Sequence, residues 1–308
     1  MKILVTGGTG MVGSVFNNIK TDHELILVSS KDCDLKNSLE TNRMIKTIKP
    51  QAVIHLAARV GGIKGNRDHM GDFFSDNMAI NLNLLDACHN NNIEKVVSVL
   101  STCIYPNNSF YPLTEDQIHM GPPHESNFGY AYAKRMLDIH SKALRRQYER
   151  NYTCAIPNNL YGPNDNFDLL NGHVVPTVIR KIWEAKQSGT PPIFWGTGRP
   201  LREFTYAPDF AETLLWMVEN YNSADPLNVG STEEMEVSAL VASVSKILDY
   251  GGEIIWDIKM PEGQFKKPSS NENFLNLYKN FNYTKIKDGL ELTCNWFIKN
   301  YPNVRGVK

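Results

Sequence analysis

The sequence predicts an α/β protein built on a doubly wound parallel sheet, with a smaller, irregular C-terminal lobe. Three observations support this fold class. Short apolar runs alternate with helical patterns through the first half of the chain, a glycine-rich turn joins the first run to the first helical pattern, and prolines and glycines become frequent after Tyr161. We therefore expect a first lobe over residues 1–160, a second lobe mainly over residues 161–308, and a segment at about residues 205–230 that returns to the first lobe.

The elements of the first lobe follow one another in a regular order. Apolar runs predict strands at residues 2–6, 24–29, 52–56, 96–100 and 153–157. Helical periodicity predicts helices at residues 11–19, 73–90 and 130–150, and a later one that begins near Ala207. Strands that alternate with helices in this way pair in parallel, because each helix returns the chain to the same end of the sheet.

Composition excludes several classes of protein. The formal net charge of −1 provides no basic field for nucleic acid, and no apolar run approaches the ~20 residues of a membrane span. The first residues are typical of a strand rather than of a secretory signal. The five cysteines are scattered and never form a Cys-x-x-Cys pair, which favours free thiols over disulfides or a zinc site. We expect a cytoplasmic protein without a metal, a nucleic-acid partner or a membrane partner.

A glycine-rich turn lies between the first predicted strand and the first predicted helix. Gly7, Gly10 and Gly13 form Gly-x-x-Gly-x-x-Gly, and Gly8 with the last two forms Gly-x-Gly-x-x-Gly. Such a turn lets a phosphate approach the backbone closely and offers it the N–H groups of a helix N-terminus. At this place in the chain, the motif predicts a Rossmann-type site for a dinucleotide cofactor. The residues expected to contact the cofactor here are Gly7, Gly8, Thr9, Gly10, Met11, Val12 and Gly13.

The end of the second predicted strand favours NADP(H) over NAD. An NAD site usually places a carboxylate there, on the ribose 2′-hydroxyl. This chain has Ser29, Ser30 and Lys31, whose hydroxyls and ammonium suit a 2′-phosphate. Asp32 follows directly, however, and Lys31 is equally compatible with a solvated loop. Further residues expected to line the cofactor are Asp34 and Leu35 near the adenine, and Leu56, Ala57 and Ala58 after the third strand.

A Tyr-x-x-x-Lys motif and an upstream serine predict a reductase. Tyr130 and Lys134 lie four residues apart on a predicted helix, so they share a face, and the ammonium should lower the pKa of the phenol. Such a phenol can protonate a carbonyl oxygen that receives hydride. Ser101 follows the fourth strand, where its hydroxyl can donate to the same oxygen. Tyr132 is a weaker candidate because its i+4 residue is Met136.

Together these motifs resemble the GDP-L-fucose synthases, a family of extended short-chain dehydrogenase/reductases. The resemblance runs nearly from end to end. Its most specific part is Ser-Thr-Cys-Ile-Tyr-Pro at residues 101–106, followed by Gly-His-Val-Val-Pro at residues 172–176. The other segments that carry it are residues 7–13, 57–62, 129–134, 159–167 and 195–198.

The resemblance implies an activity and a set of roles. The family epimerises GDP-4-dehydro-6-deoxy-D-mannose at C3 and C5 and reduces it at C4 with NADPH, which yields GDP-L-fucose. Ser101, Tyr130 and Lys134 would form the reductase triad, with Cys103 as the base of epimerisation and His173 as the acid. In an extended chain, Cys103 would lie on the same side as Ser101. Without the resemblance, Cys103 is more typical of a buried small hydrophobe and His173 of a structural histidine.

The resemblance also implies binding residues and a quaternary structure. The residues implied to contact the cofactor are Asn159, Leu160 and His173, and those implied to bind the GDP-linked sugar are Asn158, Lys181, Trp195, Arg202 and Glu262. Glu262 departs from the family's usual aspartate, which puts that contact in doubt. The predicted helices at residues 73–90 and 130–150 resemble the pair that forms a dimer interface in this class, so we expect a homodimer.

Two other functions stay open at this point. A related nucleotide-sugar epimerase or dehydratase would retain NAD through its cycle. Dehydratases typically carry Asp-Glu after the threonine that ends strand four, whereas Thr102 is followed here by Cys103 and Ile104. A non-catalytic, NADP-sensing binding protein is the other alternative, and such a protein has no need of a complete reductase triad.

Overall fold

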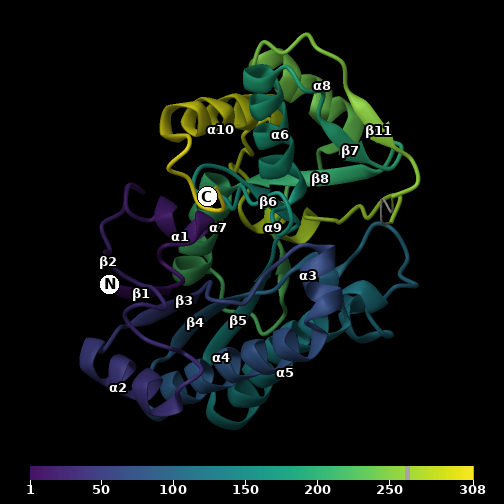
Figure 1. The fold of residues 1–308 in the computed structure, drawn as a ribbon. Coiled ribbons are helices and arrows are strands. Elements are labelled where there is room, and N and C mark those ends of the chain that lie inside the picture. The colour runs from purple at the N-terminus through teal and green to yellow at the C-terminus, as the bar shows by residue number, and fades with distance from the viewer. Residues whose placement is uncertain (261–263, 308) are drawn as a thin grey trace.

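A six-stranded parallel sheet lies at the centre of the first lobe in the computed structural model, which describes residues 1–260 and 264–307 (Figure 1). The strand order is β2-β1-β3-β4-β5-β9, and every neighbouring pair is parallel. The strands are β1 (Lys2–Thr6), β2 (Glu24–Val28), β3 (Ala52–His55), β4 (Lys95–Val99), β5 (Asn151–Ile156) and β9 (Leu227–Asn228). The doubly wound parallel sheet predicted from the sequence is confirmed.

Helices cover both faces of this sheet, which explains why its strands are apolar throughout. Ile3 and Leu4 are both fully buried but belong to different cores, since successive side chains of a strand point to opposite faces. One face is covered by α2 (Ser38–Ile48), α4 (Met70–Asn90) and α5 (Phe128–Tyr148), and the other by α1 (Met11–Val15) and α7 (Ala207–Asn220).

Two helical segments differ from the predictions. The first helix ends at Val15 rather than at residue 19, because the N–H groups of residues 16–18 bond carbonyls three residues back and tighten the turn. Helix α2 was absent from the predictions. Its signal was nevertheless in the sequence, since Asn37 caps the first turn and Glu40 stands three residues further on.

The second lobe stands above the sheet in Figure 1 and has a core of its own. Its helices are α6 (Val174–Ser188), α8 (Val237–Ile247) and α10 (Ile286–Asn300). Its strands form two small sheets, β10-β8-β6 and β11-β7, with bounds β6 (Asn159–Tyr161), β7 (Ile193–Trp195), β8 (Leu201–Tyr206), β10 (Glu234–Glu236) and β11 (Ile255–Asp257). Three other elements of the second half pack with the large sheet: α7, β9 and α9 (Glu272–Leu277) share the core that contains α1.

Short helices occupy the loops that leave the carboxyl ends of the parallel strands. They are α3 (Ile63–Asp68) after β3, and η1 (Thr102–Ile104), η2 (Glu115–His119) and η3 (Glu125–Asn127) between β4 and α5. These loops gather at one edge of the sheet because all six strands run the same way. There they meet the second lobe, where the N–H of Leu113 donates to the carbonyl of Pro268.

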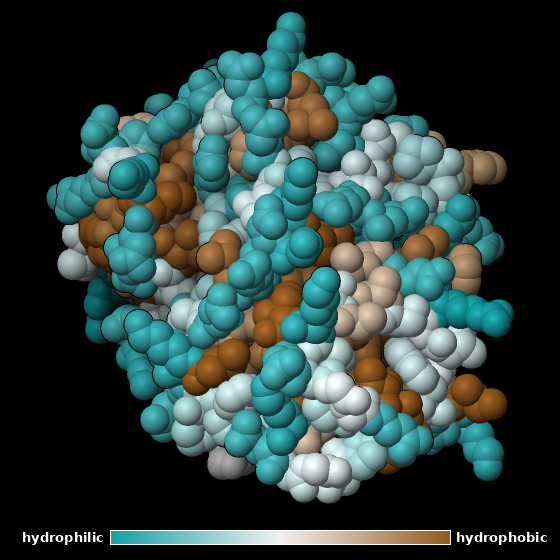
Figure 2. Space-filling view, turned by 90° about the horizontal axis from the view of Figure 1, so that it is seen from above, coloured by the Kyte–Doolittle hydropathy of each residue, from teal (hydrophilic) through white to brown (hydrophobic). Residues whose placement is uncertain are grey.

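The polarity of the surface and of the helices can be described together. Figure 2 looks down on the second lobe and shows a largely hydrophilic face with separate apolar areas. Over residues 1–260 and 264–307, none of the helices combines the length and apolarity that a bilayer crossing requires.

Candidate active site

The glycine turn after β1 has no room for a side chain at Gly8 or Gly13. Gly7 adopts φ +72°, and the N–H of Gly10 donates back to its carbonyl at 2.9 Å. A Cβ on Gly13 would overlap that same carbonyl, and a Cβ on Gly8 would overlap Leu27 of β2. Thr9 is exposed on the turn, while Met11 and Val12 begin α1, whose first turn has no side-chain cap. The backbone is therefore open to a close phosphate, as the predicted cofactor requires.

In the turn after β2, two hydrogen bonds fix the direction of the Asp32 carboxylate. The N–H and the hydroxyl of Ser29 both donate to its Oδ2, at 2.8 and 2.6 Å, and these bonds lower the pKa of Asp32. The carboxylate is thus turned back into its own turn. Ser30 and Lys31 are exposed beside it, so their hydroxyl and ammonium are accessible to a ligand. Of the two adenine candidates, Asp34 is exposed and Leu35 is buried in the core.

The loop after β3 lies against the glycine turn. A Cβ on Gly7 would sit 3.0 Å from the nitrogen of Ala57, whose N–H donates to Thr6 Oγ1. Leu56, Ala57 and Ala58 are all partly accessible. Arg59 holds the loop to α4 through a 2.8 Å ion pair with Asp76. The sequence did not identify this brace.

A buried hydrogen-bonded chain connects the strand before the glycine turn to α5. Thr6 Oγ1 and His55 Nδ1 are 2.9 Å apart, and His55 Nε2 lies 3.2 Å from Asn81 Oδ1. The Asn81 amide donates to the carbonyl of Ala133, next to Lys134, which assigns the proton of His55 to Nε2. Burial lowers the pKa of His55 to about 3, so the ring is neutral. The sequence predictions did not include His55 or Asn81, since neither stands in a motif.

Tyr130 and Lys134 share a face of α5, as predicted, but they interact differently from the prediction. Lys134 Nζ donates to the carbonyl of Val99 at 2.8 Å and lies 6.0 Å from the centroid of the Tyr130 ring. Burial lowers the pKa of Lys134 to about 8. Burial also raises the pKa of Tyr130, and the nearby Cys103 is a second cause of that rise. The predicted lowering of the phenol pKa is therefore wrong here, because desolvation of the buried phenol raises it.

Ser101 and Cys103 lie at the end of β4 in a 3₁₀ turn rather than in extended chain. Ser101 caps this turn, and its Oγ accepts the N–H of Cys103 at 3.3 Å. The thiol is half-buried and close enough to Tyr130 to affect its pKa. The structure thus brings Ser101, Cys103, Tyr130 and Lys134 together, although by a turn that the sequence reasoning did not foresee.

His173 comes from the second lobe, where it precedes the first residue of α6. Solvent reaches its ring, and desolvation followed by the positive charge of Arg305 lowers its pKa. The loop before it reaches the first lobe: a Cβ on Gly62 would lie 3.5 Å from the carbonyl of Gly172.

Comparison with known proteins decides the family. Residues 3–230 match the NAD dependent epimerase/dehydratase family. The chain is 40% identical over 310 residues to a GDP-L-fucose synthase of Dictyostelium discoideum, covering 98% of this chain and 97% of that protein. It is 36% identical over 312 residues to a GDP-L-colitose synthase of Yersinia pseudotuberculosis, covering 98% and 100%. The crystal structure of a GDP-L-fucose synthetase from Naegleria fowleri bound to NADP matches with a TM-score of 0.93 at 38% identity, covering 99% and 94%.

The chain belongs to this epimerase/dehydratase family, and within it to the GDP-L-fucose synthases. The resemblance that the motifs predicted is confirmed. The first-lobe residues described above are therefore the cofactor and catalytic candidates of a family member, and the remaining candidates lie in or near the second lobe.

The substrate candidates of this family member differ in how their polar groups are used. Asn158 is bonded within the protein on both sides of its amide, to Glu203, Ser231 and Thr205. Lys181 Nζ donates to the carbonyl of Ile193 on β7 at 2.6 Å, two residues before the half-exposed Trp195. The amide of Asn158 thus bonds other parts of the protein, whereas the indole ring of Trp195 is accessible to a ligand.

The remaining predicted residues lie along β6 and β8. Arg202 is half-buried, and its guanidinium donates to the carbonyls of Leu201 and Phe265. The Asn159 amide donates to the carbonyl of Glu203, and Leu160 is partly buried beside it. Glu262 lies outside the described residues.

Two charged residues of the site were not predicted. Glu203 is 4% exposed and accepts three hydrogen bonds, from the N–H and hydroxyl of Ser269 and from Asn158. Lys267 lies close to Cys103 and Arg202; desolvation and then the charge of Arg202 lower its pKa, while Cys103 opposes that shift. Neither residue shows a signal in the sequence, since burial of Glu203 follows from segments that meet only in the fold.

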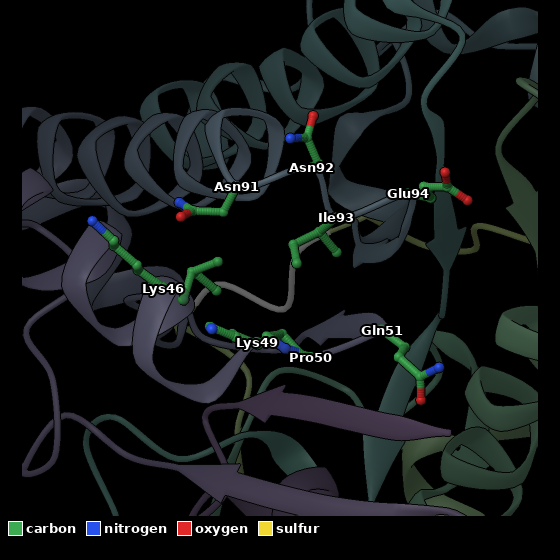
Figure 3. Close-up of a pocket in the computed structure, with 9 residues that line it drawn as sticks. Lys46, Lys49, Pro50, Gln51, Asn91, Asn92, Ile93 and Glu94 are labelled. Carbon is green, nitrogen blue, oxygen red and sulfur yellow. The ribbon is translucent and has the colours of Figure 1, made fainter.

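The surface hollow drawn in Figure 3 lies away from these residues. A cavity of about 450 Å³ lies at the amino ends of β3 and β4, with Lys46, Lys49 and Gln51 among its lining residues. The catalytic candidates follow the carboxyl ends of the strands. None of the predicted site residues lines this cavity, so we assign it no part in the chemistry.

Proposed function

We propose that this protein is an NADPH-dependent GDP-L-fucose synthase, which converts GDP-4-dehydro-6-deoxy-D-mannose to GDP-L-fucose. The observation that carries the proposal is the grouping of Ser101, Cys103, Tyr130 and Lys134 at the carboxyl end of β4, on the same edge of the sheet as the glycine turn that follows β1. A reductase needs the hydroxyl, phenol and ammonium, while the added thiol provides a base that simple reduction does not require. Membership of the GDP-L-fucose synthases supports the nucleotide sugar as substrate.

The epimerisation would begin at the thiol. Protons next to the C4 keto group are acidic because their loss gives an enolate. In the proposed step, the Cys103 thiolate takes the proton from carbon, and His173 gives a proton to the opposite face of the same carbon. The lowered pKa of His173 makes its imidazolium a stronger acid, and its exposure lets solvent restore the proton between the steps at C3 and C5.

The reduction would use the other three residues. When bound, NADPH supplies hydride to C4; the glycine turn, Ser30 and Lys31 would hold it. Ser101 Oγ accepts from the Cys103 N–H, so its own proton is available for the sugar carbonyl. Burial keeps Tyr130 protonated, and its O–H donates to the oxygen that becomes an alkoxide. Lys134 receives no ion pair in the described part of the chain, and its charge would favour release of that proton.

The test is NADPH oxidation at 340 nm with the keto sugar, followed by NMR of the product. Oxidation with an L-fuco product supports both halves of the proposal. Because a GDP-L-colitose synthase is a relative, the product spectrum is also compared with GDP-L-colitose. A D-configured product would remove the proposed roles of Cys103 and His173, and no oxidation would refute the activity.

Two matched variants separate the half-reactions. Cys103→Ser should abolish epimerisation and leave direct reduction, whereas Tyr130→Phe should slow reduction by roughly 10²–10⁴-fold and leave epimerisation. The enzymes are compared by deuterium incorporation from D₂O and by NADPH oxidation. Unchanged products with Cys103→Ser, or full turnover with Tyr130→Phe, would contradict the assigned roles.

We also propose a homodimer in the cytoplasm. α4 and α5 pack side by side and expose large apolar side chains, including Phe74 and Leu82 on α4 and Phe128 and Ile139 on α5. Such a patch along two helices is typical of a protein interface. The five cysteines are all free, four of them buried, which suits a reducing compartment.

A further inference from the structure

We propose that the C-terminal tail, residues 301–307, is a positioning element of the epimerisation site, and that it holds the loop Asp165–His173 so that His173 can reach the sugar. The inference rests on the proposed function, because it gives the tail a part in that reaction. It concerns Arg305 and Gly306 above all, which touch the loop. Neither residue was a candidate from the sequence.

The backbone of the tail is bonded to the backbone of the loop. The N–H of Phe167 donates to the carbonyl of Arg305 at 2.8 Å. Arg180 then joins both segments, because its Nη1 donates to the carbonyl of Phe167 at 3.0 Å and to the carbonyl of Gly306 at 2.9 Å. Arg180 itself is fixed by a 2.7 Å ion pair with Glu184. Since Arg180 belongs to α6, the tail, the loop and the helix that follows His173 form one unit.

The contact between the tail and the loop leaves room only for glycine at position 306. Gly306 has φ +88°, and a Cβ there would overlap Asn166 Oδ1 and the backbone nitrogen of Asp168. The tail is anchored beside it by Val304, which is 6% exposed and packs in the core of the second lobe. A side chain at Gly306 therefore cannot be accommodated by a small rotation, and the tail or the loop must move.

The loop transmits its position to His173. Asp168 accepts the N–H groups of Leu170 and Asn171 through Oδ1, and the N–H of Gly172 through its carbonyl. The segment between Asp168 and His173 is therefore a closed set of turns rather than a slack connection. Displacing Asp168 displaces the imidazole, and a misplacement of about 1 Å can reduce a rate by roughly 10²-fold.

Charge supports the same assignment. Arg305 lies near both His173 and Asp165: after desolvation, its positive charge contributes to the lowered pKa of His173 and opposes the raised pKa of Asp165. Asp165 is 4% exposed, its burial raises its pKa to about 7, and Oδ2 lacks a hydrogen-bond partner among the described residues. The tail thus brings the guanidinium to the buried end of the loop that carries the proposed acid.

The test compares two glycines. Gly306→Ala introduces the overlap, while Gly189→Ala is the matched control, because Gly189 has φ +74° and open space around it. Each enzyme is incubated with the keto sugar in D₂O, and deuterium at C3 and C5 is measured by mass spectrometry alongside the sugar configuration by NMR. NADPH affinity and the melting temperature are recorded for both. A third variant ends at Val304 and removes the contact without a clash.

A displaced His173 leaves Cys103 in place, so the thiol can exchange protons on one face while inversion fails. Gly306→Ala and the shortened chain should therefore incorporate deuterium with retained configuration, with inversion reduced about 10–100-fold. NADPH affinity should stay within about twofold, and Gly189→Ala should behave like the wild type. Wild-type inversion rates in Gly306→Ala and in the shortened chain, or an equal fall of exchange, inversion and reduction, would overturn the inference. Absence of exchange in the wild type would instead refute the proposed function.

Discussion

Mild acid should destabilise this protein through His55. The ring is fully buried between Thr6 and Asn81, and burial lowers its pKa to about 3, with the charge of Lys134 as a second cause. In the unfolded chain the pKa of a histidine is about 6.5. Between these values the unfolded state binds a proton that the folded state does not, so stability is lost as the pH falls below about 6.5. At neutral pH the full stability is present.

The size of this effect follows from the two pKa values. For one such site, the free energy of unfolding falls by about 2 kcal/mol between pH 7 and pH 5. His55→Gln replaces the ring by a side chain that does not titrate, so this share of the pH dependence should vanish. The variant is also less stable at both pH values, because Thr6 and Asn81 lose their partner. The prediction therefore concerns the difference between the two pH values.

Urea unfolding at pH 7 and pH 5 measures the effect. The loss of unfolding free energy on acidification should be about 2 kcal/mol larger in the wild type than in His55→Gln. Other titrating groups, including His140 and His173, cancel in this comparison. His69→Gln removes a solvent-exposed ring and is the control, with the loss expected for the wild type. An equal loss in the wild type and His55→Gln would refute the reasoning.

Three further predictions test other parts of the structure. Lys31→Ala should weaken NADPH binding about tenfold and leave NADH binding unchanged, as measured by fluorescence titration, because its ammonium would meet the 2′-phosphate alone; an equal loss for both cofactors would contradict this. Ile139→Glu should convert the proposed dimer to a monomer in light scattering, while Leu39→Glu, at an even more exposed apolar residue on α2, should not; a dimer in both would place the interface elsewhere. Glu203→Gln should lower the free energy of unfolding by about 2 kcal/mol, because a buried charged acceptor of three hydrogen bonds is lost. The same change should raise KM for the GDP-sugar more than it lowers kcat. An unchanged KM would show that Glu203 has no part in substrate binding.

The sequence predicted those features that depend on neighbours in the chain. The parallel sheet follows from the alternation of apolar runs and helices, and the glycine turn from three glycines at fixed spacing. The exceptions are informative. Cys103 was expected in extended chain, but Ser101 caps a 3₁₀ turn and changes its direction. Tyr130 was expected to be a more acidic phenol, yet its burial, which no motif records, has the larger effect.

The residues of the two proposed half-reactions belong to different parts of the fold. Ser101, Tyr130 and Lys134 rest on β4 and α5, elements of the large sheet whose positions are set by its core. The proposed acid of epimerisation, His173, precedes α6 of the second lobe, and the loop before it is bonded to Arg305, more than 100 residues further along the chain. Damage to the second lobe should therefore affect inversion before it affects reduction. A heat or urea titration in which inversion and reduction decline together would show that both depend on one cooperative unit.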